Sequence, residues 1–442
     1  MGEFARTAEP RRSPGVTAAV RHGLGWLVFS NALGVMIAIL LLLPQLNVWL
    51  GEWTYGRWMM VHMNTALFGW CSVPMLALLF KAYGADRGRV AAWCRPVVWL
   101  WSAALFAGSY SWLQGHSSGK LFLDWSGYSR VFFPMALLAL WVLLAIAHFE
   151  NRDAKSGSRS SGIARVSGLI ALLPVPFAIY LASSPSIYPA VNPETGGPTG
   201  ASQLESTLGI VLILLALPFM VARRKSMLKR IAVIAWGVFL IEALLCFMLG
   251  RSDMGHHAPA QYLSLASVLV WIALIPAYYD RFEWNIATRR WRTAFLAWWT
   301  GLVISGWVMF LPGVLDRLKF TDALVGHSLV AVAGFLSAYI LFILVQVVGE
   351  DDAWVLNRRW SFYAWNMGVL AYVVVIMIAG WIESRDPAFT IAPGEARDVI
   401  YAIRLLTGVS MLAASAEWLA ASLSLRDESA AVKLEASEVR VA

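Results

Sequence analysis

Residues 321–348 read TDALVGHSLVAVAGFLSAYILFILVQVV. This stretch is long enough to cross a bilayer as a helix, since a spanning helix needs about 20 largely apolar residues. A lone histidine, His327, stands near its start, and Ser328, Ala331, Ala333 and Gly334 after it are small. A histidine beside a smooth helix surface predicts a flat ligand lying against this helix.

The rest of the chain has the composition of a multi-pass membrane protein. Of its 442 residues, 59% are hydrophobic and only 14% are charged, with a mean hydropathy of +0.63. Soluble proteins are about half apolar and about a quarter charged, so this composition excludes a soluble class. We expect one membrane domain at 23–425 between cytoplasmic tails at 1–22 and 426–442. The polar N-terminal tail runs directly into a full-length apolar segment, which is not the pattern of a cleavable signal peptide.

Twelve apolar segments predict an all-α integral membrane fold of twelve transmembrane helices, at roughly 24–46, 58–80, 96–114, 131–149, 164–183, 204–222, 231–250, 261–279, 294–312, 322–348, 362–382 and 399–424. With the N-terminus in the cytoplasm, 26 of the 35 Lys and Arg residues fall in cytoplasmic tails and loops and eight on the other side, with Arg404 inside span twelve. This asymmetry predicts that both termini are cytoplasmic. It also accounts for the net charge of +8 without nucleic acid as a partner.

Two further features concern organisation. The outer connection 183–203 is rich in Pro and Gly and predicts either a structured cap over the outer face or a flexible linker. The sequence shows no internal repeat, which counts against transporters built from duplicated halves.

Five of the seven histidines are predicted at the outer membrane face. His62 and His327 lie at matched depth, about one turn into spans two and ten. His256 and His257 form an adjacent pair in the outer connection after span seven, and His116 lies in another outer connection. The remaining two, at positions 22 and 148, fall at the inner face, where we expect interfacial roles.

Imidazole is a common ligand for heme iron and for copper. Taken alone, His62 is equally well explained as a helix-to-helix hydrogen bonder, and a His pair in a loop is more often solvated or starts a helix. Matched depth and the adjacent pair together favour a metal or heme site. We expect His116 to be structural. The three cysteines, at 71, 94 and 246, form neither CxxC nor CxxCH and are expected to be small core residues.

Three ionisable residues fall inside or at the edge of predicted spans. Glu242, in the middle of span seven, predicts a proton relay, because desolvation favours the protonated form of a carboxyl; pairing within the core is the alternative. Glu205, at the outer start of span six, predicts either a helix N-terminal carboxylate or a metal ligand. Arg404 lies early in span twelve.

The stretches VHMNTALFGW (61–70), GHHAPAQYLSLASVLVWIALIPAYYD (255–280) and DALVGHSLVAVAGF (322–335) resemble the catalytic subunit, subunit I, of the heme-copper oxidases. The C-type cytochrome c oxidases and the nitric oxide reductases are the most similar members. The resemblance covers about 22–425. It implies that His62 ligates a low-spin heme, that His327 ligates a high-spin heme, and that His256 and His257 bind a second metal, either copper or non-heme iron.

The chain departs from that family at two ligand positions. Leu329 stands where span ten of the family carries a second heme-ligating histidine, and the window 196–208 at the start of span six contains no histidine. Glu205 resembles the span-six carboxylate of the nitric oxide reductases and is the candidate third ligand of the second metal. The number of hemes, one or two, stays open, and an alternative is that His62 and His327 ligate one heme together.

The resemblance implies an oxidoreductase that reduces dioxygen or nitric oxide, small gas ligands, at an outer-face site. It would receive electrons from a separate donor subunit, either of the cytochrome c type or quinol-linked, in a bacterial-type inner membrane. Two alternatives remain. One is a non-catalytic heme-binding or structural paralogue, and the other is a twelve-span transporter whose pathway Glu242 and Arg404 would mark.

Overall fold

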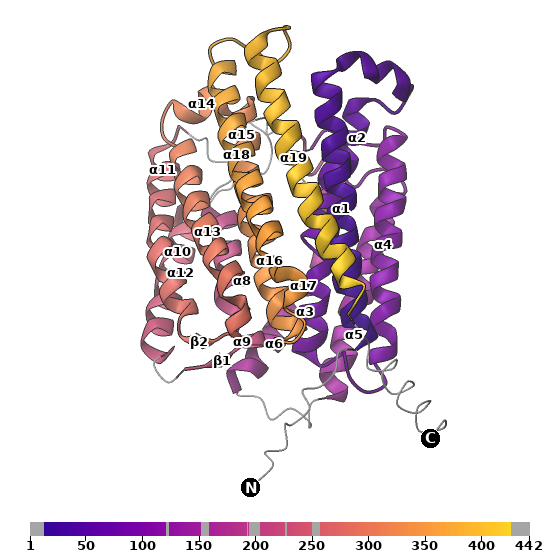
Figure 1. The fold of residues 1–442 in the computed structure, drawn as a ribbon. Helices are drawn as coiled ribbons and strands as arrows, with labels where there is room; N and C mark the ends of the chain where they lie inside the picture. Colours follow the sequence, from indigo (N-terminus) through magenta and orange to yellow (C-terminus); the bar gives the residue numbers. More distant parts are fainter. Residues whose placement is uncertain are drawn as a thin grey trace, which may run out of the picture.

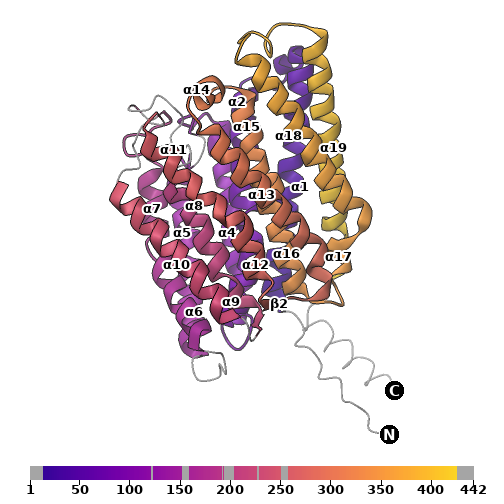
Figure 2. The ribbon, with the colours of Figure 1, turned by 90° about the vertical axis from the view of Figure 1, so that its left-hand side faces the viewer.

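The computed structural model describes residues 13–120, 123–151, 159–191, 193, 204–225, 228–249 and 257–425. This part of the chain forms a bundle of long helices that run along one common direction (Figures 1 and 2). In chain order its helices are α1 (Pro14–Leu42), η1 (Pro44–Leu50), α2 (Tyr55–Asn64), η2 (Thr65–Trp70), α3 (Val73–Tyr83), α4 (Ala91–Leu113), α5 (Ser129–Glu150), α6 (Arg159–Leu172), α7 (Val175–Ala182), α8 (Leu204–Ala216), α9 (Pro218–Val221), α10 (Leu228–Leu249), α11 (Pro259–Ala266), η3 (Ser267–Val270), α12 (Trp271–Tyr279), η4 (Ile286–Thr288), α13 (Arg289–Met309), α14 (Val314–Leu318), α15 (Asp322–Leu329), η5 (Val330–Leu336), α16 (Ser337–Val348), α17 (Trp354–Asn357), α18 (Arg359–Glu383) and α19 (Glu395–Ser422).

The protein is a helical, multi-pass membrane protein. Within the described residues, nine helical segments are long and apolar enough to cross a membrane. The other three predicted spans are helical as well, as α4, α13 and the shorter pair α8–α9. Each predicted span therefore contains a helix, while the count of twelve crossings and the cytoplasmic side of the termini stay predictions.

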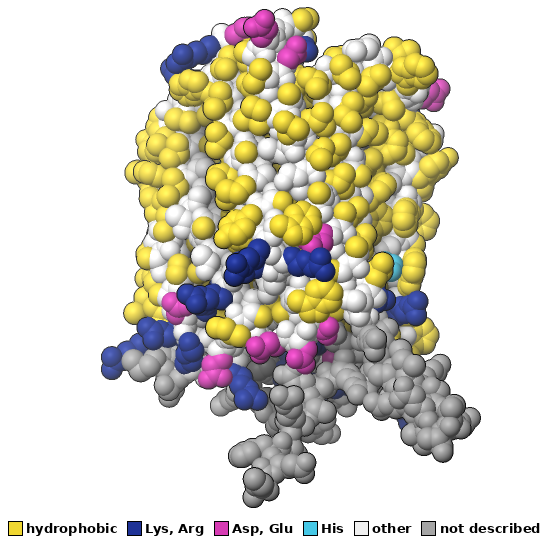
Figure 3. Space-filling view, viewed as in Figure 1, with side chains coloured by type: hydrophobic (Ala, Val, Ile, Leu, Met, Phe, Trp, Pro, Cys, Tyr) yellow, Lys and Arg dark blue, Asp and Glu magenta, His cyan; other side chains and the backbone are white. Residues whose placement is uncertain are grey.

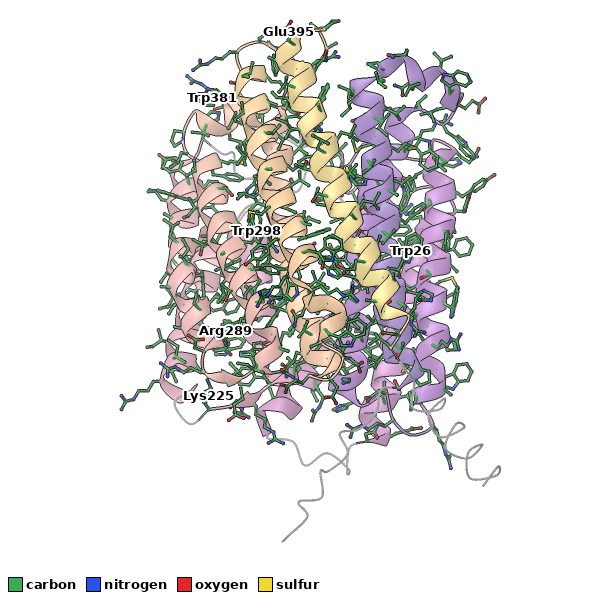
Figure 4. The ribbon with its side chains drawn as sticks, in the orientation of Figure 1. Trp26, Lys225, Arg289, Trp298, Trp381 and Glu395 are labelled. Carbon is green, nitrogen blue, oxygen red and sulfur yellow. The ribbon has the colours of Figure 1, made fainter. Side chains whose placement is uncertain are left out.

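The surface agrees with burial in a bilayer. Figure 3 shows hydrophobic side chains over most of one face and charged side chains gathered mainly toward one end. Lys225 and Arg289 lie toward that end (Figure 4), which we call the basic end. A two-stranded antiparallel ribbon also lies there, in which β1 (Arg223–Arg224) pairs with β2 (Phe282–Glu283).

The two ends of the described chain meet at the basic end. Helix α19 packs against both α1 and α18. The guanidinium of Arg21, on α1, donates hydrogen bonds to the carbonyls of Ser422, Leu423 and Leu425 at distances of 3.1, 3.2 and 2.7 Å. A basic side chain thus satisfies carbonyls that the end of a helix leaves without partners. Both ends therefore lie on the same side of the bundle.

Helix α1 begins earlier than the sequence predicts. It starts at Pro14, inside the range 1–22 that is predicted as a tail. Proline suits the first position of a helix because it has no N–H to leave unpaired, and the side chain of Ser13 accepts a hydrogen bond from the amide of Val16 at 3.4 Å. Residues 14–22 therefore extend the first helix toward the basic end.

Several spans are broken rather than continuous. Prolines follow the breaks before α3, α7 and α9, where Pro74, Pro176 and Pro218 stand at the first or second helical position. The segments η2 and η5 are π-helical and interrupt the second and tenth predicted spans. A π-helical turn inserts a residue into the helix and is frequent at functional sites. Each π-helical segment begins three positions after a predicted ligand histidine, η2 after His62 and η5 after His327.

Parts of the predictions fall outside the described residues. Most of the connection 183–203 lies there, as do His256 and the tail 426–442. Of the three cysteines, Cys71 and Cys94 are buried and Cys246 is half-buried.

Candidate functional site

His62, at the end of α2, is held by α1. Its Nδ1 lies 2.8 Å from the backbone carbonyl oxygen of Ser30. A carbonyl can only accept a hydrogen bond, so Nδ1 carries the ring proton and Nε2 carries a lone pair. The Cε1 edge of the ring lies against Gly34, where an added Cβ would come within 2.9 Å. Within the described chain, Nε2 has no hydrogen-bond partner.

His327, on α15, is held in the same way by α13. Its Nδ1 lies 3.0 Å from Oγ of Ser305, and that hydroxyl donates its own proton to the carbonyl of Leu302 at 3.2 Å. The hydroxyl therefore accepts from Nδ1–H, and the lone pair is again on Nε2. Gly306 lies at the Cε1 edge, with an added Cβ 3.3 Å away. No described residue hydrogen-bonds to Nε2 of this ring either.

Each histidine precedes a π-helical segment whose backbone is fixed by a tryptophan. The indole N–H of Trp101, on α4, donates to the carbonyl of Phe68 at 2.8 Å. The indole N–H of Trp365, on α18, donates to the carbonyl of Ala333 at 3.1 Å. Phe68 and Ala333 both stand six positions after their histidine. A π-helical insertion disturbs the regular backbone ladder, and the indole supplies a donor to a carbonyl at that point.

A second tryptophan packs against a glycine seven positions after each histidine. At Gly69 an added Cβ would lie 2.7 Å from the side chain of Trp26, and at Gly334 it would lie 2.6 Å from the ring of Trp298. Only glycine lets the indole approach so closely.

The same two tryptophans also hydrogen-bond to matching partners. Trp26 donates to Oγ of Ser102 at 3.0 Å, and Trp298 donates to Oδ1 of Asn366 at 2.9 Å. Ser102 and Asn366 directly follow Trp101 and Trp365, the residues that bind the π-helical carbonyls.

The chain therefore contains two copies of one three-helix arrangement. The first copy comprises α1, the α2–η2–α3 segment and α4; the second comprises α13, the α15–η5–α16 segment and α18. Trp26 and Trp298 lie at about the same level of the bundle in Figure 4. The two copies share contacts rather than a long run of sequence, in keeping with the absence of a sequence repeat. In each copy a glycine stands seven positions after the histidine and an aromatic residue, Trp70 or Phe335, follows it.

Of the small residues after His327, Gly334 faces a side chain of the protein rather than a ligand. Gly334 faces the indole of Trp298, and the neighbouring Gly326 faces Ile376 and Met377 of α18. At Gly334, therefore, the flat group against this helix is the indole of Trp298; the ligand surface around Ser328, Ala331 and Ala333 stays a prediction.

A buried polar cluster lies beyond the two histidines, toward the end opposite the basic end. Arg404 donates to Oδ2 of Asp322 at 2.8 Å and to the hydroxyl of Tyr372 at 3.3 Å. Asp322 stands five residues before His327 on the same span. Tyr55, seven residues before His62, is within electrostatic range of Arg404. The cluster thus joins the starts of the two histidine-bearing spans to α19.

The predicted second-metal ligands are only partly described. Nε2 of His257 lies 3.3 Å from Oδ1 of Asp316, and the His257 side chain is 69% exposed. His256 and the side chain of Glu205 lie outside what the structure describes. Among the residues that it does describe, no three His, Cys, Asp or Glu side chains come together as a metal site. The second-metal site stays a prediction.

Glu242 has a partner inside the bundle. Its Oε2 accepts a hydrogen bond of 2.6 Å from the indole N–H of Trp271, on α12. The residue is 3% exposed, so the carboxyl lies inside the bundle. A buried carboxyl is compatible with the predicted proton relay, which the structure does not test.

The other three histidines have local contacts. Nδ1 of His22 lies 2.8 Å from Oγ of Ser102, and the ring of His148 lies edge-on to Tyr83. His116 is exposed in the loop after α4 and contacts the ring of Tyr128 edge-on.

Comparison with known proteins finds a likeness in fold. No family model matches the chain, and no curated protein matches it. Among solved structures, the chain is similar to that described as "Cryo-EM structure of a heme-copper terminal oxidase dimer provides insights into its catalytic mechanism". The TM-score is 0.60 at 10% sequence identity, over 93% of this chain and 84% of the other. The chain thus shares the fold of a heme-copper terminal oxidase.

Proposed function

We propose that this protein is a heme-binding membrane oxidoreductase in which His62 and His327 ligate heme iron through Nε2. One observation carries the proposal: in both copies of the three-helix arrangement, Nδ1–H is held by an acceptor on the first helix while Nε2 has no described partner. Histidines that bind metals almost always donate their other ring N–H in this way, which fixes the tautomer and the ring orientation. A histidine that only joins two helices by a hydrogen bond would not be expected to show this held Nδ1–H and unpartnered Nε2 in both copies.

The residues fit heme by their donor chemistry. Neutral imidazole is the most common axial ligand of heme iron. When bound, heme would supply one-electron chemistry at its iron and a position for a small gas ligand. The chain itself would orient each imidazole through Ser30 and Ser305 and keep each supporting helix in place through Trp101 and Trp365.

The fold likeness and the resemblance of the motifs support dioxygen or nitric oxide as the substrate. Electrons would come from a separate donor subunit, of the cytochrome c type or quinol-linked. Glu242 is the buried carboxyl proposed to relay protons. No step is assigned to a second metal, because the described His257 is exposed and paired with Asp316.

A non-catalytic heme-binding role is the second candidate. One observation favours it: Leu329 occupies the position of a further heme ligand in the family. Consumption of dioxygen or nitric oxide by the purified protein, given a chemical reductant, distinguishes the two candidates. Metal analysis that finds copper or non-heme iron would favour the first.

The two serines give a sharp test of ligation. Ser305→Ala removes the acceptor of His327 Nδ1–H, whereas Ser30→Ala leaves the backbone carbonyl that holds His62. Loss of such a supporting hydrogen bond typically costs 10- to 100-fold in metal affinity. We therefore expect Ser305→Ala to weaken heme retention about 10-fold or more in transfer to apomyoglobin, with Ser30→Ala close to wild type. Equal retention in both variants would count against the proposal.

A further inference from the structure

A groove lies on the outside of the bundle between α13 and α18. Its volume is about 890 Å³, and its lining includes Arg289, Arg290, Ala297, Trp298 and Gly301 of α13 and Asn366 of α18. Arg289, Ala297 and Gly301 recur at intervals that place them on one face of α13. The hydrogen bond from Trp298 to Asn366 joins the two walls.

The groove runs from the basic end into the apolar middle of the bundle. Figure 4 shows Arg289 toward that end and Trp298 farther along the bundle axis. From Arg289 to Gly301 the helix rises roughly 18 Å, which is near the depth of one leaflet in a hydrocarbon core of about 30 Å. Tyr363, Met367 and Leu370 on the opposite wall are 58%, 54% and 45% exposed, so the groove opens outward.

Positive charge is concentrated at the mouth. Arg289 is exposed and forms no ion pair with a carboxylate in the described chain. The guanidinium of Arg290 donates to the carbonyl of Asn357 and lies over the ring of Phe362, 5.6 Å from its centroid, again without a described carboxylate partner. Both stand in the first turn of α13, where the helix dipole adds positive potential.

An unsatisfied acceptor lies beside these arginines. Nδ2 of Asn357 donates to the carbonyl of Ala287 at 2.8 Å, but Oδ1 is buried without a donor from the described residues. A buried amide oxygen without a donor is costly. Because this oxygen is buried, the two arginines are the polar groups at the mouth that an anionic ligand would meet.

We propose that the groove binds an anionic phospholipid of the phosphatidylglycerol kind. Its phosphate would lie at Arg289 and Arg290, and an acyl chain would follow Ala297 and Gly301 toward the middle of the bundle. Charge complementarity and a leaflet-deep apolar groove distinguish this occupant from a neutral lipid.

The test is native mass spectrometry of the full-length protein in detergent, titrated with phosphatidylglycerol or with phosphatidylcholine of the same acyl chains. We expect a preference for phosphatidylglycerol. Arg289→Gln should weaken its binding about 5-fold and Arg289→Gln/Arg290→Gln about 30-fold, in line with the contribution of single basic residues near anionic lipid. Ala297→Phe, which fills the groove without changing charge, should weaken both lipids.

The matched control is Arg292→Gln. Arg292 is on the same turn but lies 3.6 Å from Asp280 and does not line the groove, so its variant should bind like wild type. Thermal melting of every variant checks that the bundle remains folded. Equal affinity for the two lipids, an equal loss in Arg292→Gln, or unchanged binding in folded Arg289→Gln/Arg290→Gln would overturn the proposal. So would co-purification of a quinone that Ala297→Phe displaces.

Discussion

The double variant His62→Ala/His327→Ala is expected to purify without heme, whereas each single variant should keep about half of the wild-type amount. The reason is structural. The two imidazoles are held by different helices, α1 and α13, in two copies of the same arrangement, so that loss of one leaves the support of the other intact. Heme per protein, measured as the pyridine hemochrome, gives the result directly.

His116→Ala is the control for the histidine variants, because that side chain is exposed in a loop; it should keep all of its heme. Heme retained in the double variant would show that neither histidine ligates iron. Complete loss in either single variant would instead support one heme shared by His62 and His327. Helix content and melting temperature of each variant separate ligand loss from unfolding.

Arg404→Leu is expected to lower the free energy of unfolding by about 3 kcal/mol, the lower end of the range for breaking a buried ion pair. The side chains of Arg404 and Asp322 are 9% and 20% exposed. Removing the guanidinium leaves the Asp322 carboxylate without its cation in a poorly hydrated place. Thermal unfolding of the purified protein in detergent reports the change.

Two further variants sharpen this prediction. Asp322→Asn/Arg404→Leu should be more stable than Arg404→Leu alone, because a neutral amide replaces the stranded charge. Arg358→Leu, which breaks the pair with Glu417 at 2.9 Å, should cost less than about 1 kcal/mol, since Arg358 is 51% exposed. If Arg404→Leu and Arg358→Leu lower the melting temperature equally, the buried pair does not stabilise the protein more than the exposed one.

The helices could be predicted from the sequence because each predicted span is a run of apolar residues close to spanning length. The interruptions could not. Nothing in VHMNTALFGW or GHSLVAVAGF marks a π-helical turn, since the turn depends on indoles from other helices, Trp101 and Trp365. The start of α1 at Pro14 was missed because hydropathy detects apolar residues, whereas Ser13 and Pro14 are capping signals.

The sequence placed His62 and His327 at matched depth but did not reveal what surrounds them. The sequence does not tell which of the 23 tryptophans contact the histidine-bearing spans, because enrichment at membrane interfaces accounts for most of them. Only the three-dimensional arrangement shows that Trp26 and Trp298 pack on the glycines that stand seven positions after His62 and His327. The likeness of the two three-helix arrangements could not be predicted for the same reason, because the two copies share contacts rather than long stretches of identical residues.

The optical spectrum of the purified, dithionite-reduced protein, recorded with and without carbon monoxide, tests the central claim most directly. Ligation of heme by His62 and His327 predicts a Soret band that carbon monoxide shifts, because Leu329 stands where the family would carry a further histidine ligand. A protein that is folded and monodisperse but shows no Soret absorption would contradict the account.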